Sequence, residues 1–173
     1  MITAPHIFYL TKKTKGKIIV IDSLYTETAR NADIYIQPKF GSDIFLALGI
    51  ANYLIQNELC DKEFIEKHIF GFEEFKRRIS KFTVDYVSEL TGIPPEQIKD
   101  FAEIYAYEKP SIIFIGYGLQ RRFGGGETVR AISLLPALIG LHRGFYYSNT
   151  DSLNINFDYI MGGFLGKPSR IIP

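Results

Sequence analysis

Residues 18–21 read Ile-Ile-Val-Ile, and these four consecutive β-branched apolar residues constrain the fold more than any other stretch. A short continuous apolar run is typical of a strand that is buried on both faces, as in parallel sheets. Asp22 follows the run directly. Because open α/β sheets bind ligands beyond the carboxyl ends of their strands, this acid is expected where a nucleotide would lie.

Two further segments predict strands of the same kind, at 33–37 and at 111–116. Between them, the turn at 41–43 leads into a segment with apolar residues at positions 44, 47, 48, 51, 54 and 55, the spacing of one face of a helix. The sequence therefore predicts an α/β fold: a Rossmann-like parallel sheet, with its first strand at 17–22, flanked by helices.

The remaining segments predict a helical insert and an extended tail. Residues 61–109 contain several short amphipathic patterns, with Asp61 and Thr83 as expected helix caps and Gly92 as an expected helix end, and most of their charges are expected on a solvated face. Residues 143–173 carry many aromatic residues without helical or strand periodicity, so we expect them to pack on another chain or on a second copy. The expected boundaries are residues 1–142 for the α/β domain and 143–173 for the tail.

A glycine-rich loop at 116–127 follows the third predicted strand and precedes an apolar helix expected over 128–141. A strand, a glycine-rich loop and a helix together are typical of a phosphate cradle. The stricter dinucleotide and Walker A patterns fail, because Arg121 stands where a glycine is needed and Glu127 follows Gly126. Arg121 and Arg122 suit phosphate oxygens, and the alternative is a surface loop with two solvated arginines.

Asp22 and Asp43 are candidates for recognition of a base. Each carboxylate could accept from the Watson–Crick edge of guanine, whose N1–H and N2–H₂ groups are adjacent donors. The alternative makes Asp43 a helix cap and Asp22 a turn residue. Spacing does not decide between these two interpretations.

The composition excludes several classes of function. The formal net charge is +1, which gives no basic surface for nucleic acid. No apolar run approaches the ~20 residues of a membrane span. The only cysteine, Cys60, is expected to be a small buried apolar residue, and the three scattered histidines are expected to be structural or solvated. No metal-ligand set and no catalytic side chain is identified.

Many short blocks occur in an order that resembles the molybdopterin oxidoreductases. They lie at 19–22 (Ile-Val-Ile-Asp), 26–29 (Thr-Glu-Thr-Ala), 32–33 (Ala-Asp), 38–43 (Pro-x-x-Gly-Ser-Asp), 46–49 (Leu-Ala-Leu-Gly), 71–75 (Gly-Phe-Glu-Glu-Phe), 91–94 (Thr-Gly-Ile-Pro), 116–121 (Gly-Tyr-Gly-Leu-Gln-Arg) and 128–132 (Thr-Val-Arg-Ala-Ile). More narrowly, the chain is similar to the dimethyl sulfoxide reductase and formate dehydrogenase superfamily, whose members carry bis(molybdopterin guanine dinucleotide). Each block alone is weak, but their order is specific.

The resemblance implies a role in binding one guanine dinucleotide of that cofactor, which carries molybdenum or tungsten. Matched residue by residue, the family's cofactor contacts correspond to Ile21, Asp22, Gly41, Asp43, Tyr117, Gly118 and Arg121. The family usually has Asp-Pro-Arg where this chain has Asp22, Ser23 and Leu24, so one expected polar contact is replaced by an apolar side chain.

The resemblance also implies that the chain is a fragment or split subunit of a larger oxidoreductase. The family's iron–sulfur cysteines and its molybdenum ligand would precede residue 1, and the second dinucleotide site would be completed after residue 173. The expected partners are the remaining domains or subunits, and a cytoplasmic location is expected. Two alternatives remain: a non-catalytic binding or assembly module that keeps the fold, and a nucleotide-binding α/β enzyme of another class.

Overall fold

The structure is a computed structural model that describes residues 11–146 together with Tyr9, Tyr159 and Gly166. Most of the segment expected as a tail lies outside these residues. The strands are β1 (Ile19–Ile21), β2 (Ile34–Ile36), β3 (Ile113–Phe114) and β4 (Phe145–Tyr146). The helices are α2 (Glu27–Arg30), α3 (Asp43–Gln56), α4 (Lys62–His68), α5 (Phe72–Ile79), α6 (Val84–Thr91), α7 (Pro95–Tyr107), the 3₁₀ helix η1 (Tyr117–Gln120) and α8 (Gly125–Leu138).

The strands form two parallel pairs rather than one sheet among the described residues. β1 pairs with β2, with Ile19 opposite Ile34, and β3 pairs with β4. The parallel α/β class is therefore confirmed, with strands shorter than predicted. The partner of β3 was not foreseen, because residues 145–146 were assigned to the tail.

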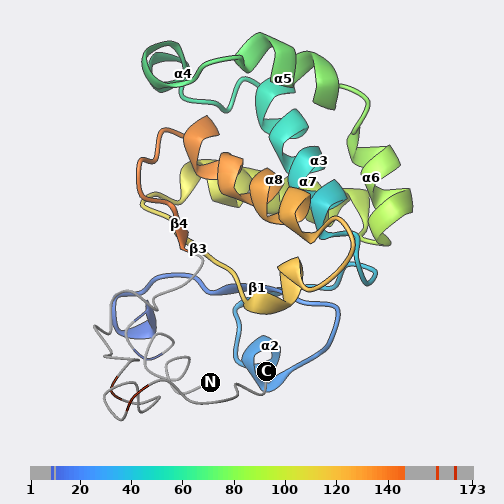
Figure 1. Cartoon of the computed structure of the whole chain (residues 1–173), viewed down its shortest axis with the longest axis vertical. Coiled ribbons are helices and arrows are strands. Elements are labelled where there is room, and N and C mark those ends of the chain that lie inside the picture. Colours follow the sequence, from blue (N-terminus) through green and yellow to red (C-terminus); the bar gives the residue numbers. More distant parts are fainter. Residues whose placement is uncertain (1–8, 10, 147–158, 160–165, 167–173) are drawn as a thin grey trace.

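The apolar core lies among the helices and not on β1. Helix α3 is central and packs against α5, α6, α7 and α8, as Figure 1 shows. Leu54 of α3, Val87 of α6 and Ile98 of α7 are fully buried. Gly49 lets α6 approach closely, since a Cβ there would lie 2.7 Å from Val87 Cγ2. The predicted burial of the first strand on both faces is wrong: its residues are only partly covered, and Ile21 is 39% exposed.

The predicted ends of the short helices are confirmed. Asp61 Oδ1 accepts a hydrogen bond from the Phe64 N–H at 2.9 Å and begins α4, and Thr83 Oγ1 accepts from the Tyr86 N–H at 3.3 Å and begins α6. Gly92 ends α6 with φ +75°, a conformation that favours glycine. Local capping chemistry therefore determines where these helices start and stop.

Helix α8 spans Gly125–Leu138, whereas 128–141 was expected. It begins earlier because Gly124, at φ +71°, turns the chain, and Gly125 packs against the Gln120 carbonyl without room for a Cβ. It ends earlier because Gly140 adopts φ +80° and the Leu141 N–H donates to the Pro136 carbonyl at 2.9 Å. The glycine-rich loop is consequently shorter than predicted.

Cys60 was expected to be a small buried apolar residue. It packs against the core but is only partly buried. Burial raises the pKa of its thiol to about 11, so the thiol is protonated at neutral pH. Within the described part of the chain, no helix is long and apolar enough to cross a bilayer.

Candidate functional site

The loops that follow β1 and β2 are joined at the carboxyl ends of these strands. The Asp22 N–H donates to the Ile36 carbonyl at 3.2 Å, and the Tyr35 hydroxyl donates to the Asp22 carbonyl at 2.8 Å. Asp22 Oδ1 accepts from the Leu24 N–H at 2.9 Å, so Asp22 does hold the turn after β1. This bond uses one carboxylate oxygen and leaves further acceptor positions.

An open pocket of about 600 Å³ lies beside this edge. Its lining comes from the loops after β1 and β2 and from the turn between α6 and α7: Ser23, Leu24, Gln37, Pro38, Lys39, Phe40, Thr91 and Gly92. The Lys39 N–H donates to the Thr91 carbonyl at 2.7 Å, and Lys39 Nζ donates to the Glu89 carbonyl at 2.9 Å. These bonds hold the pocket together, while Leu24 (69% exposed) and Phe40 (86% exposed) present apolar surface.

A single guanidinium connects the turn before α3 to the glycine-rich loop. Arg122 Nη2 donates to Asp43 Oδ2 at 3.2 Å and to Thr128 Oγ1 at 3.0 Å, and Arg122 Nη1 donates to the Gly41 carbonyl. The Arg122 and Asp43 side chains are only 19% and 22% exposed. Charge-assisted bonds at such a position are stronger than neutral ones. Asp43 is therefore an ion-pair partner here, and it makes no capping bond to α3.

The contact with Arg122 requires glycine at position 41. Its φ of +84° lies in the left-handed region, and a Cβ at this position would lie 2.9 Å from Arg122 Nη1. Both the backbone conformation and the close approach of the guanidinium require glycine. Ser42 begins α3 without a side-chain capping bond, and its hydroxyl donates to the Lys39 carbonyl at 2.6 Å.

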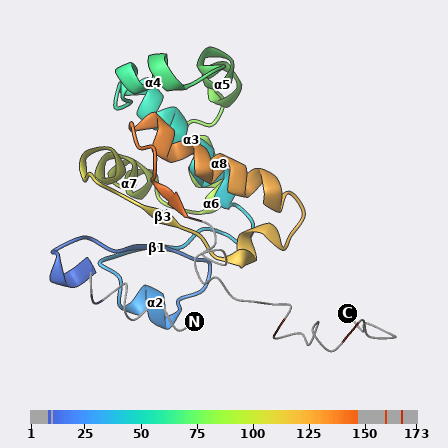
Figure 2. The ribbon, with the colours of Figure 1, turned by 60° about the vertical axis from the view of Figure 1, so that its left-hand side comes forward.

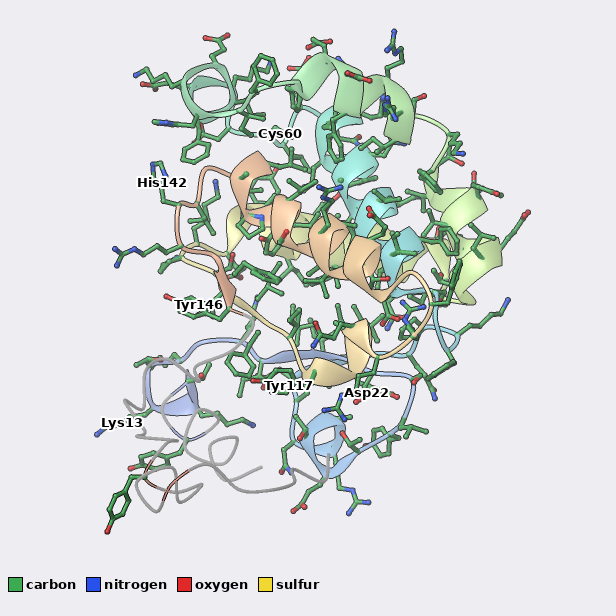
Figure 3. The ribbon with its side chains drawn as sticks, in the orientation of Figure 1. Lys13, Asp22, Cys60, Tyr117, His142 and Tyr146 are labelled. Carbon is green, nitrogen blue, oxygen red and sulfur yellow. The ribbon has the colours of Figure 1, made fainter. Side chains whose placement is uncertain are left out.

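The first part of the glycine-rich loop forms η1, which lies beside β1 in Figures 1 and 2. Figure 3 shows Asp22 and Tyr117 on the same side of β1. Tyr117 is half exposed, and the Arg121 N–H donates to the Gly118 carbonyl at 3.2 Å to close η1. Of the predicted contact residues, Gly41 and Asp43 are joined to the glycine-rich loop through Arg122, and Tyr117 lies on the same side of β1 as Asp22 (Figure 3). Ile21 ends β1, Gly118 lies in η1 and Arg121 follows it.

Sequence reasoning named Arg121 as the contact residue and did not assign Arg122 a structural partner. In the structure the side chain of Arg122 reaches Gly41 and Asp43. Two adjacent arginines in a loop give no periodic signal that tells which one turns inward. The only signal would have been Thr128, a buried residue whose hydroxyl accepts a hydrogen bond from the Arg122 guanidinium.

A parallel α/β framework, in which the loops after β1 and β2 meet at the carboxyl ends of the strands, defines a class of domain that commonly binds ligands at that edge. Within that class, the family model of the molybdopterin oxidoreductases matches residues 1–159, and the chain belongs to this family. The resemblance carried by the sequence blocks is thereby confirmed. The assignment of individual cofactor contacts stays a prediction.

Individual relatives agree with this family assignment. A probable oxidoreductase of Bacillus subtilis, YoaE, is 39% identical over 77% of this chain and 20% of its own length. Formate dehydrogenase H of Escherichia coli is 36% identical over 80% of this chain and 19% of its own length. The solved structure of acetylene hydratase from Pelobacter acetylenicus superposes with a TM-score of 0.75 at 33% identity, covering 79% of this chain and 19% of that one. The chain spans about a fifth of the length of these relatives.

Proposed function

We propose that this chain forms one wall of a molybdopterin guanine dinucleotide site in a larger molybdopterin-dependent oxidoreductase. The observation that carries the proposal is the contact of Arg122 with Gly41 and Asp43, which joins two strand-end loops into one preformed edge. Preformed concave edges with a few convergent polar groups are typical of cofactor sites. The family membership of the chain supports the same conclusion.

The residues at this edge fit the guanine end of such a cofactor. Asp22 and Asp43 each use only part of their acceptor capacity within the chain, at Leu24 and Arg122 respectively. The adjacent donors of guanine need acceptors of this kind. The pocket of about 600 Å³ adjoins Asp22 through Ser23 and Leu24, and Asp22 and Asp43 lie outside its lining. The backbone of Ile21, at the end of β1, and that of Gly41 would contact the ligand.

The glycine-rich loop would serve the phosphate and pterin portion. Tyr117 and Gly118 lie on η1, and Arg121 follows directly, so a cation and exposed backbone meet at one place. An arginine guanidinium matches phosphate oxygens in geometry and charge. When bound, the cofactor would supply a molybdenum or tungsten centre that exchanges electrons or oxygen atoms with a small substrate. The residues of this chain would bind and orient it.

The proposal also covers the division of this chain and the parts that other segments of the enzyme would supply. Residues 1–142 would be the α/β part of the dinucleotide domain, extended by β4 (Phe145–Tyr146), and the rest of 143–173 would pack on the remainder of the enzyme or on a second copy. The metal ligand, any iron–sulfur cluster and the second dinucleotide site would come from other segments. A cytoplasmic location is proposed on the same basis.

Cofactor content tests the proposal in the longer protein that contains this chain. We expect Asp43→Asn or Asp22→Asn to lower the guanosine monophosphate released per protein by acid hydrolysis about tenfold, because a charge-assisted bond contributes about 1.5–3 kcal/mol. Asp100→Asn, at an exposed position of α7, is the matched control and should leave the content unchanged. Protein that folds but releases no guanosine monophosphate, or equal content in all variants, would contradict the proposal.

A further inference from the structure

His68 and His142 lie against each other although they come from distant parts of the chain. His68 is the last residue of α4, and His142 follows α8, at the opposite end of that helix from the glycine-rich loop. Their ring centroids are 4.8 Å apart, with an interplanar angle of 72°. Both side chains are exposed, and His142 is labelled in Figure 3. Their pairing was not predicted.

The framework that carries the two rings is well anchored. The Asp61 N–H donates to the Leu138 carbonyl at 2.8 Å, which fixes the start of α4 to the end of α8. Lys109 Nζ donates to the Ile139 carbonyl at 2.7 Å, holding the segment that leads to His142. The Phe64 ring contacts both imidazoles, with centroids at 4.7 Å and 4.6 Å. The rings are therefore held together before any ligand binds.

The separation of the two rings allows both to bind one metal ion, and it is also an ordinary distance for packed rings, since Phe64 lies equally close to each imidazole. Metal–nitrogen bonds of about 2.0–2.1 Å place two imidazole centres about 5 Å apart when both rings bind one tetrahedral ion. The observed distance is 4.8 Å. Ring nitrogens can be exchanged by a half-turn about the terminal side-chain torsion, which orients a nitrogen toward the ion at little cost.

The surroundings leave room for a metal with water as its other ligands. A pocket of about 440 Å³ adjoins the pair, lined by Ser133 and otherwise mostly by apolar residues. No cluster of three or more metal-ligating side chains occurs among residues 11–146, so this chain would supply two ligands. Lys67, which precedes His68, is paired with Glu63 at 2.6 Å, and this pairing reduces its repulsion of a cation. Arg143, which follows His142 in the sequence, adds a positive charge beside the pair.

We propose that His68 and His142 form a two-imidazole site for one divalent transition-metal ion of the Cu²⁺, Ni²⁺ or Zn²⁺ group. Imidazole nitrogen suits these ions, and carboxylate-preferring Mg²⁺ and Ca²⁺ would not bind here. A bound ion fastens α4 to the segment that enters β4. This site is separate from the proposed dinucleotide edge and does not depend on the proposed function.

Titration of the full chain with Ni²⁺ alone, without a polyhistidine tag and at pH 7.5, tests the site. Calorimetry should give one ion per chain, and His68→Gln and His142→Gln should each weaken binding tenfold or more. His6→Gln, which removes the third histidine, is the matched control and should bind as the wild type does. Electron paramagnetic resonance of the Cu²⁺ complex should show two nitrogen ligands in the wild type and one in either variant.

Circular dichroism without metal checks that each variant is folded. Because His68 and His142 are exposed, glutamine at either position should leave the melting temperature of the metal-free chain unchanged. Equal affinity in the wild type and in both variants would overturn the proposal. So would a tenfold loss on His6→Gln, or Cu²⁺ spectra with a single nitrogen in the wild type.

Discussion

Replacing Arg122 by glutamine is expected to lower the free energy of unfolding by about 2 kcal/mol, the size of one hydrogen bond to a charged group, because water can reach the partly exposed site and replace part of what is lost. The substitution removes the guanidinium from Asp43, Thr128 and the Gly41 carbonyl at once. It also leaves the Asp43 carboxylate, only 22% exposed, without its cation. Urea denaturation of the chain measures the change.

Arg121→Gln is the matched control, since it changes the same charge in the same loop. Arg121 is exposed, so the expected change is within about 0.5 kcal/mol. Equal destabilisation by the two substitutions would show that the effect comes from net charge and not from the contact with Gly41 and Asp43. Equal stability of Arg122→Gln and the wild type would mean that the contact contributes nothing.

Replacing Gly41 by alanine is expected to cost about 2 kcal/mol, because a left-handed conformation alone costs a residue with a Cβ roughly 1–2 kcal/mol. The added Cβ would also lie 2.9 Å from Arg122 Nη1, so the guanidinium must shift away from Asp43. Two effects therefore act in the same direction. Thermal and urea unfolding should both report the loss.

Gly126→Ala provides the comparison for that substitution. Gly126 lies in the first turn of α8, does not have a positive φ, and has open space where the Cβ would be placed. Alanine there should be neutral or stabilise the chain by up to about 1 kcal/mol, because glycine is unfavourable within a helix. A larger loss at Gly126 than at Gly41 would contradict the assigned role of the left-handed turn.

The helical part of the fold could be predicted because its signals are local. Asp61 and Thr83 cap their helices through bonds to amides three residues on, and Gly92 ends α6 through its own backbone conformation. The apolar spacing of α3 likewise reports its buried face directly. The parallel pairing of the strands could also be predicted, because continuous apolar runs are typical of parallel strands.

Contacts between distant segments could not be predicted in the same way. Two residues at 145–146 pair with β3 although nothing in their composition distinguishes them from the rest of the predicted tail. The inward side chain of Arg122 depends on how η1 and α8 orient the loop, and the neighbouring Arg121 has the same chemistry. The pairing of His68 with His142 depends on the anchoring of α4 to α8. These features depend on the tertiary packing of distant segments, which the periodicity of the sequence does not report.

Nuclear magnetic resonance titration of the chain with guanosine diphosphate and adenosine diphosphate tests the central claim most directly. Guanine offers adjacent N1–H and N2–H₂ donors, and adenine does not offer that pair. We predict tighter binding of the guanosine nucleotide, by about tenfold if one charge-assisted bond is gained, with shifts at the amides of 22–24 and 41–43. Equal weak shifts for both nucleotides, unchanged in Asp22→Asn and Asp43→Asn, would contradict guanine recognition at this edge.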